Sequence, residues 1–258
     1  MIREKLLSQG IGEEFGFRWR GLDVSRIEAL SDAVFGFAIT LLVVSLEVPR
    51  TFDELLVMMR GFVAFAISFA MLILVWYQQY IFFRRYGLRD TLTIVLNAFL
   101  LFVVIFYVYP LKFVWTFLTN LLLGFEVRVR LASGELVYPI DRDQGGTMMI
   151  VFGLGYVAVF AVFALLYTRA YRKRAELEMN TLETYDTRVE IESILLNIAV
   201  GLLSVSIAAL GGWRFAAISG WAYGLIGPLL TIHGVVRGKR RKRMEAQIRA
   251  EAVEPVAA

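Results

Sequence analysis

Residue types that could do chemistry gather near the start of the first long apolar stretch. Arg26 and Glu28 precede a run of apolar residues that also contains Ser31 and Asp32. A carboxylate within such a stretch is costly beside lipid, so Asp32 should contact protein or water. From its position alone, two interpretations stay open: a carboxylate just inside the headgroup region, or one that bonds to neighbouring helices.

Enzymatic chemistry has little support elsewhere in the sequence. The chain has no cysteine and a single histidine, His233, which excludes a thiol nucleophile and a His-rich metal centre within one chain. No Ser/His/Asp arrangement, phosphate-binding glycine loop or dinucleotide fingerprint occurs. We therefore predict that the protein is not an enzyme and carries no cofactor.

The elements that position these residues follow from the composition. Of the 258 residues, 58% are hydrophobic and 19% are charged. Soluble domains contain roughly 45–50% apolar and about 25% charged residues. The composition therefore excludes a disordered chain, a coiled coil and an ordinary soluble enzyme, and it predicts an integral membrane protein.

We predict an all-α integral membrane protein with six transmembrane helices per subunit. A helix needs about 20 mostly apolar residues to cross the hydrocarbon core. The stretches that meet this requirement run over Ile27–Val48, Leu55–Phe83, Thr91–Phe125, Thr147–Tyr167, Ile191–Leu210 and Trp213–Val236.

The distribution of basic residues predicts the orientation. Most of the 27 Lys and Arg residues lie in the N-terminal segment, in the loops after the second and fourth spans, and in the tail. By the positive-inside rule, both termini are cytoplasmic in a multi-pass protein of the cell inner (plasma) membrane. We accordingly divide the chain into a cytoplasmic N-terminal segment (1–25), a six-helix transmembrane domain (26–236) and a basic cytoplasmic tail (237–258).

Two segments outside the spans have patterns of their own. Residues 126–140, between spans 3 and 4, alternate apolar and charged side chains around a turn-like Ala132-Ser133-Gly134. A small extracytoplasmic β-hairpin and a solvated ordered loop are both compatible with this pattern. The dense basic run at 237–243 favours binding to anionic lipid headgroups over binding to nucleic acid.

Periodicity divides the first helix into faces. Phe37, Leu41 and Val44 are spaced i, i+4, i+7 and line one face, with Thr40 beside them. At 100° per residue, Asp32 lies about 140° from Phe37, so we expect Asp32 to point into the protein. From periodicity alone, ordinary helix packing is the preferred interpretation of this stripe.

Other polar residues are expected to have structural roles. Residues 25–28 have the form of a capping box, in which Ser25 and Glu28 exchange hydrogen bonds at the start of a helix. Asn97 and Asn197 lie within spans, where amides commonly form hydrogen bonds between helices.

The first helix also resembles the signature of the transmembrane protein 175 family. That signature is an Arg followed, after three residues, by Phe-Ser-Asp; here Arg26 is followed by Leu30-Ser31-Asp32, with Leu30 in place of the Phe. A second block is similar to the family pattern as well. It comprises Trp76, Asp90-Thr91-Leu92, Leu96-Asn97 and Tyr109-Pro110. Gln79-Tyr80 stand where the family usually has a His pair.

This resemblance implies an activity and an assembly. Family members are potassium channels of lysosomes and bacteria, and the bacterial members are homotetramers of six-span subunits. Their four first helices surround the pore, and apolar rings form its constriction. The resemblance therefore implies a passive, potassium-permeable cation channel of weak to moderate selectivity, with a hydrophobic gate and potassium as the permeant ion.

The resemblance also implies roles for individual residues, carried over by motif position. The pore constriction would comprise Phe37, Thr40, Leu41 and Val44, with Thr40 as a hydroxyl layer. The scaffold motif that ties the pore helix to its neighbours would comprise Arg26, Ser31 and Asp32. The supporting family positions are Trp76, Asp90 and Asn97.

Two alternative functions stay open. A secondary transporter or proton-coupled carrier would need an ionisable residue at mid-membrane and broken helices. The mid-span regions hold Asn and Thr but no clear buried acid, which argues against a carrier. A non-conducting membrane scaffold would use the Phe37 ring as a permanent plug.

Overall fold

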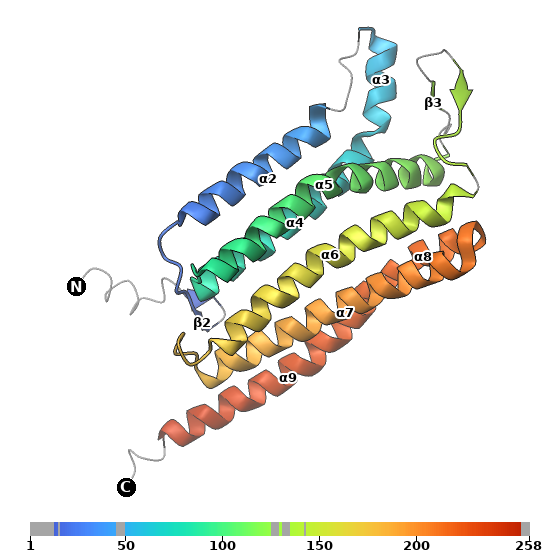
Figure 1. The fold of residues 1–258 in the computed structure, drawn as a ribbon. Coiled ribbons are helices and arrows are strands. Elements are labelled where there is room, and N and C mark those ends of the chain that lie inside the picture. The colour runs from blue at the N-terminus through green and yellow to red at the C-terminus, as the bar shows by residue number, and fades with distance from the viewer. Residues whose placement is uncertain are drawn as a thin grey trace.

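The structure, a computed structural model, is a row of long helices that lie side by side (Figure 1). It describes residues 13–14, 16–44, 50–124, 129–130, 135–141 and 143–253. In chain order the row contains α2 (Arg26–Val44), α5 (Thr91–Leu122), α6 (Gln144–Arg172), α7 (Thr181–Gly211) and α9 (Ile226–Val253). A further helix, α4 (Phe62–Tyr86), packs against both α2 and α5. Both ends of the row, α2 and α9, therefore keep one open side.

Short elements connect these helices. The N-terminal strands β1 (Glu13–Glu14) and β2 (Phe17–Arg18) pair antiparallel, and α3 (Phe52–Arg60) precedes α4. Between α7 and α9 the chain forms the 3-10 helix η1 (Gly212–Phe215), helix α8 (Ala216–Ala222) and the 3-10 helix η2 (Tyr223–Leu225).

Side-chain caps determine where the principal helices begin. The predicted capping box is confirmed: the Ser25 N–H donates to Glu28 Oε2 at 2.7 Å, and the Glu28 N–H donates to Ser25 Oγ at 3.3 Å. Asp90 caps α5 by accepting from the Thr93 N–H. A second capping box, between Asn180 and Glu183, opens α7. Each cap satisfies backbone donors that would otherwise lack partners.

The membrane architecture is helical, as predicted. Among the described residues, α4, α5, α6 and α7 are the four helices long and apolar enough to cross a membrane. Helix α2 has 19 residues, about 28 Å at 1.5 Å per residue, but it carries three charges near its start. The predicted sixth span is divided among η1, α8, η2 and the first turns of α9.

Several helix bounds differ from the predicted spans. The second predicted span is interrupted at Gly61, which caps both α3 and α4. Helix α7 begins at Thr181, well before the predicted Ile191, and α9 continues through the basic run to Val253. The physical reason is that hydropathy marks the limits of the hydrocarbon layer, whereas a capped polar helix can continue into water.

The segment with the alternating pattern between α5 and α6 is described only in part. Strands β3 (Val129–Arg130) and β4 (Leu136–Val137) pair antiparallel, with Val129 opposite Val137. Residues 125–128 and 131–134, including the turn-like Ala132-Ser133-Gly134, lie outside the described residues.

Polar contacts hold α9 along the first turns of α7. Arg241 Nε donates to both carboxylate oxygens of Asp186, at 2.9 and 3.0 Å. Glu192 accepts from Arg237 at 2.7 Å and lies 3.0 Å from His233 Nε2. Since these contacts lie on one side of α9, Arg237 and Arg241 are half-buried while their neighbours in the basic run face outward.

Candidate pore-lining helix and its anchors

Helix α2 has one face in the core and one face open. Its buried side chains are Ser31, Phe35, Ala38 and Leu42, spaced i, i+4, i+7, i+11 along one stripe. This stripe contacts α5 and α4. The opposite face of the helix covers no other part of the described chain (Figure 1).

The predicted constriction residues lie on or beside the open face. Phe37 is 57% exposed within the single subunit, and Leu41 is half-buried at the edge of the core. Thr40 is exposed, and its hydroxyl donates to the Gly36 carbonyl at 2.9 Å. Because the hydroxyl hydrogen is used within the helix, the lone pairs of Thr40 Oγ1 are left to accept from outside. The side chain of Val44, at the end of α2, is outside the described part.

A buried chain of polar groups holds the opposite face. Ser31 is 1% exposed, and its hydroxyl donates to the Ile27 carbonyl. Asn97 of α5 donates through Nδ2 to Ser31 Oγ at 3.0 Å, and Gln79 of α4 donates to Asn97 Oδ1. This chain joins α2, α5 and α4 at one level, and it confirms the predicted interhelical role of Asn97. A buried, fully bonded network of this kind fixes relative helix positions.

Asp32 lies in a different place from the one expected. The angle to Phe37 predicted a side chain that points into the protein, but Asp32 is exposed within the subunit. Trp76 of α4 donates its indole Nε1–H to Asp32 Oδ1 at 2.8 Å. The prediction was wrong because an angle from one exposed residue does not locate the buried stripe, which runs through Ser31. Arg26, the first residue of α2, is also exposed.

Asp90 links two helix ends outside the spans. Its carboxylate accepts from Arg169 Nε at 2.9 Å and from the Thr93 hydroxyl at 2.8 Å. Burial alone would raise the pKa of Asp90, but the hydrogen bonds from Arg169 and Thr93 outweigh it and lower the pKa from 3.8 to about 2. The end of α6 is thereby tied to the start of α5.

The C-terminal end of α2 has a separate anchor. Lys112 of α5 donates through Nζ to the Leu42 carbonyl at 2.8 Å. Leu42 belongs to the last turn of α2, where carbonyl groups lack intrahelical partners and carry partial negative charge. A lysine at this position supplies both a hydrogen-bond donor for the carbonyl and a positive charge opposite the partial negative charge.

The chain that leads into α2 is fixed by two other helices. The backbone N–H groups of Arg20 and Gly21 both donate to the Arg84 carbonyl, at 3.0 and 3.1 Å. The Arg20 side chain forms an ion pair with the buried Glu183 of α7 at 2.6 Å. The start of α2 is thus connected to α4 and α7 through a few residues of extended chain.

Three of these anchors were not assigned from the sequence. Gln79, which the resemblance marked only as a departure from the family pattern, donates to the Asn97 amide. Lys112 and Arg169 could have been suspected because a charge within or at the edge of a long apolar stretch needs a partner. Spacing along the sequence does not reveal which helix supplies that partner.

The arrangement does not resemble a catalytic or metal centre. Within the described ranges, no group of three or more His, Cys, Asp or Glu side chains is placed to hold a metal ion. What the geometry presents is one helix with a rigidly anchored face and a free face that carries aromatic, hydroxyl and aliphatic side chains. The fold and site therefore define a helical membrane protein whose first long helix is built to face something outside the subunit.

Comparison with known proteins identifies the family. The family model described as "Endosomal/lysosomal potassium channel TMEM175" matches residues 26–107. A protein named "Potassium channel" from Marivirga tractuosa is 40% identical over 246 residues, which cover 93% of this chain and 98% of that protein. The chain belongs to the TMEM175 family, as its first-helix motif indicated.

A solved structure and a second named potassium channel agree with this assignment. A crystal structure of a variant of the potassium channel MtTMEM175, in complex with a Nanobody-MBP fusion protein, is 40% identical and superposes with a TM-score of 0.75. It covers 88% of this chain and 99% of its own. "Potassium channel Cha6605_3372" from Chamaesiphon minutus is 25% identical over 180 residues, 67% of this chain and 75% of that protein.

Proposed function

We propose that the chain is one subunit of a homotetrameric, passive, potassium-permeable channel in the cell inner (plasma) membrane. Four copies of α2 line its central pore. The observation that carries the proposal is the division of α2 into an anchored face and an open face that presents Phe37 and Thr40. The membership of the chain in a family whose named relatives are potassium channels supplies the permeant ion.

The constriction follows from the side chains on the open face. Phe37 and Leu41 provide apolar rings, Val44 extends the same stripe by periodicity, and Thr40 adds a layer of hydroxyl oxygens. An apolar ring offers a permeant ion no replacement for its hydration water, so the constriction gates by dewetting and conducts when wide enough for a partly hydrated ion. Because potassium loses water more easily than sodium, this design gives weak to moderate selectivity.

The scaffold motif acts behind the pore rather than on the ion. Ser31, Asp32, Trp76 and Asn97 tie α2 to α4 and α5, and Asp90 ties α5 to α6. Arg26 belongs to the same motif and lies exposed at the start of α2. These residues set the radius at which four copies of α2 stand around the axis.

Topology and lipid contacts complete the proposal. The six spans are α2, α4, α5, α6, α7 and the segment from α8 into α9, and both termini are cytoplasmic. The outward residues of the basic run, Lys239, Arg240, Lys242 and Arg243, bind anionic lipid headgroups and not nucleic acid. No cofactor is required, since the only ligands are the permeant ions.

Ion flux into liposomes tests the activity. Purified protein is reconstituted with potassium, and then sodium, as the only gradient ion, and flux is normalised with an ionophore. We expect flux that favours potassium and is abolished by Leu41→Trp. The matched control is Leu165→Trp, which adds the same bulk at an exposed position of α6 and should leave flux unchanged.

The assembly is tested on the same samples. Mass measurement in nanodiscs should give four subunits, and a monomer would remove the central pore. Absence of flux with either ion from a verified tetramer would favour the plugged scaffold instead. Flux that requires a proton gradient would favour a proton-coupled carrier.

A further inference from the structure

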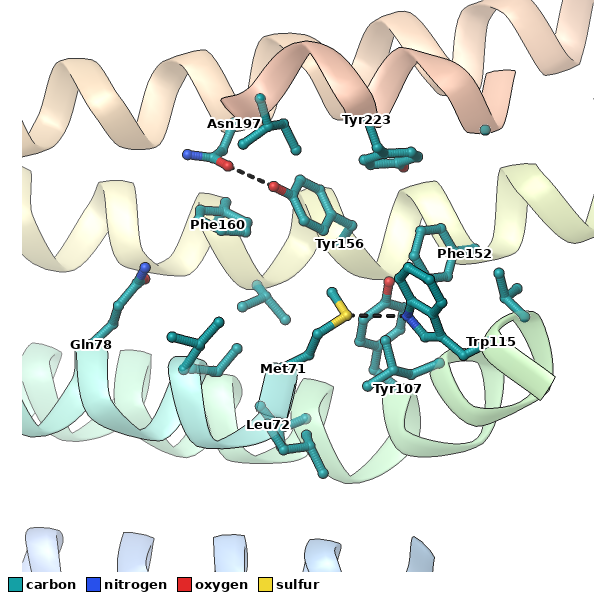
Figure 2. A pocket seen from close by; sticks show the side chains of 18 of the residues that line it. Met71, Leu72, Gln78, Tyr107, Trp115, Phe152, Tyr156, Phe160, Asn197 and Tyr223 are labelled. Atoms are coloured by element: carbon teal, nitrogen blue, oxygen red, sulfur yellow. Dashed lines mark hydrogen bonds between the residues drawn. The ribbon is translucent and has the colours of Figure 1, made fainter. Parts of the chain in front are cut away.

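A cavity lies inside the subunit, away from the open face of α2 (Figure 2). Its volume is about 400 Å³, and residues of α4, α5 and α6 line it, with contributions from α7, α8, η2 and α9. Small-molecule sites typically measure about 300–1,000 Å³ and are mostly apolar with a few placed polar groups. The size of this cavity is therefore that of a ligand site rather than that of a packing defect.

The wall of the cavity is apolar and uncharged. Aliphatic and thioether side chains cover one part, among them Met71, Val75, Leu111 and Val159. No lining residue is charged. An ionised ligand would lose its hydration without compensation there, so the wall selects an uncharged molecule.

Aromatic rings cover one end of the cavity. Tyr107 and Phe152 lie with ring centroids 5.7 Å apart, and Phe152 and Tyr223 lie 5.4 Å apart edge to face. The Trp115 ring closes the same end, where its Nε1–H donates to Met71 Sδ at 3.1 Å (Figure 2). Rings arranged around a space favour a planar or ring-containing guest.

Two polar groups at the wall, on Tyr156 and Asn197, bond to each other. Tyr156 donates its hydroxyl hydrogen to Asn197 Oδ1 at 2.6 Å, and Asn197 Nδ2 donates to the Ser193 carbonyl at 2.9 Å. This confirms the predicted interhelical role of Asn197. These groups are consequently not the ones that a guest would recognise.

Two hydroxyls at the wall, those of Tyr223 and Tyr107, have no hydrogen-bond partner in the described part of the chain, and Tyr107 is the more deeply buried of the two residues. Tyr107 is 8% exposed, and its hydroxyl oxygen is buried. The Tyr107 ring lies against Gly155, where the Cβ of any other residue would clash with it. Figure 2 shows the hydroxyl directed toward α6, within the ring of aromatic side chains. A buried donor without an acceptor costs free energy, which a guest with an acceptor oxygen would recover.

We propose that this cavity binds an uncharged, ring-containing apolar molecule that carries a carbonyl or ether oxygen, and that Tyr107 donates its hydroxyl hydrogen to that oxygen. The molecule enters from the hydrocarbon layer, where such compounds partition. The site is separate from the ion pathway along α2. Its test does not depend on conduction, so it stands even if the proposed channel activity fails.

Benzophenone is a suitable probe because it is an uncharged aromatic ketone that cross-links to nearby C–H groups under near-ultraviolet light. The full-length protein in nanodiscs is labelled over a range of benzophenone concentrations, and the labelled peptides are identified by mass spectrometry. We expect saturable labelling at Met71 and Met149, which both line the cavity. Labelling confined to the exposed faces of α5, without saturation, would overturn the proposal.

Two competitors of the same shape test the hydrogen bond. Dicyclohexyl ketone has an acceptor oxygen, and dicyclohexylmethane lacks one. Competitor concentrations are expressed as concentrations in the membrane. In the wild type, the ketone should compete at a concentration at least 5-fold lower than the hydrocarbon, and Tyr107→Phe should abolish that difference. The control Tyr109→Phe, at an exposed position on the same helix, should retain it.

A second variant tests occupancy of the cavity itself. Val159→Phe places extra bulk in the cavity, and it should reduce saturable labelling by benzophenone. The protein should keep its elution profile as an assembled particle. Equal competition by ketone and hydrocarbon in the wild type would show that Tyr107 makes no hydrogen bond to a guest. Unchanged labelling in Val159→Phe would show that the labelled site is not this cavity.

Discussion

The Trp76 indole donates its N–H to the Asp32 carboxylate at 2.8 Å, across the contact between α4 and α2. Asp32 is exposed within the subunit, so this hydrogen bond is what connects its side chain to α4. A hydrogen bond to an ionised acceptor is roughly twice as strong as a neutral one. The pair therefore fixes the rotation of α2 from the side that the buried stripe does not reach.

Replacement of Asp32 should separate scaffolding from ion contact. Asp32→Ala removes the acceptor and should destabilise the assembled protein by about 1.5–3 kcal/mol, the range for hydrogen bonds to charged groups. Asp32→Asn keeps an acceptor oxygen and should lose clearly less. Thermal unfolding of the purified assembly measures the difference. A well-assembled Asp32→Ala protein with an altered potassium-to-sodium ratio would instead place Asp32 at the ion.

Substitutions in the hydrogen-bonded chain Ser31–Asn97–Gln79 should have non-additive effects on the free energy of unfolding. Asn97→Ala removes the acceptor of the Gln79 amide and the donor to Ser31 Oγ, and it should cost about 1–3 kcal/mol. Combining Asn97→Leu with Gln79→Leu removes the polar groups together and should cost less than the sum of the two single changes. Asn120→Ala, nearer the other end of α5, is the control. Strict additivity in denaturant unfolding would mean that the amides act independently.

Phe37 should control the width of the constriction. Phe37→Ala removes an aromatic ring from the open face of α2, and it should raise potassium flux several-fold because a wider apolar ring stays wet more easily. Phe102→Ala makes the same change at an equally open position of α5, where flux should not respond. Unchanged flux from folded Phe37→Ala protein would assign the stripe to lipid or subunit packing.

The contacts of Asp90 should make the stability of the fold sensitive to acid. Its pKa is lowered from 3.8 to about 2 in the folded protein by Arg169 and Thr93, which outweigh burial. A depressed carboxyl pKa stabilises the fold above the unfolded value, and that stability is lost as pH falls from about 4 toward 2. Asp90→Asn should remove about 1–2 kcal/mol at neutral pH and flatten the melting temperature over that acid window. Parallel pH profiles for both proteins would contradict the role of this carboxyl.

The basic side chains of α9 should divide into two sets with different roles. Lys239, Arg240, Lys242 and Arg243 are exposed, whereas Arg237 and Arg241 bond to α7. Changing the four exposed residues to Gln should lower retention of phosphatidylglycerol, measured by native mass spectrometry, because each basic residue near an anionic surface contributes about 1 kcal/mol. Arg237→Gln with Arg241→Gln should loosen α9 while retaining lipid. Equal lipid loss in both proteins would refute the division.

The features that the sequence predicted best are those that depend on local physics. The capping box at Ser25, the helical membrane class and the interhelical amides Asn97 and Asn197 each follow from short-range chemistry or from solvent preference. The family motif around Arg26 and Asp32 was also sufficient to identify the family. The roles of Phe37 and its stripe stay predictions, since a single subunit leaves that face uncovered.

Other features depend on partners that sequence spacing does not specify. Lys112 meets the Leu42 carbonyl, and Arg169 meets Asp90, across contacts that exist only once the helices pack. Asp32 was misplaced because its direction depends on which face of α2 meets α5. The cavity at Tyr107 is likewise a property of several helices together, and no segment shows it alone.

The fixed chain before α2 limits how a pore could change its width. Arg20 and Gly21 hold the start of that helix to Arg84, and Lys112 holds its last turn. Helix α2 is therefore a beam supported at both ends, with Gly36, which has open space beside it, between the supports. A beam of this kind opens a passage by bowing at its middle or by tilting with the whole subunit, and not by sliding along its axis.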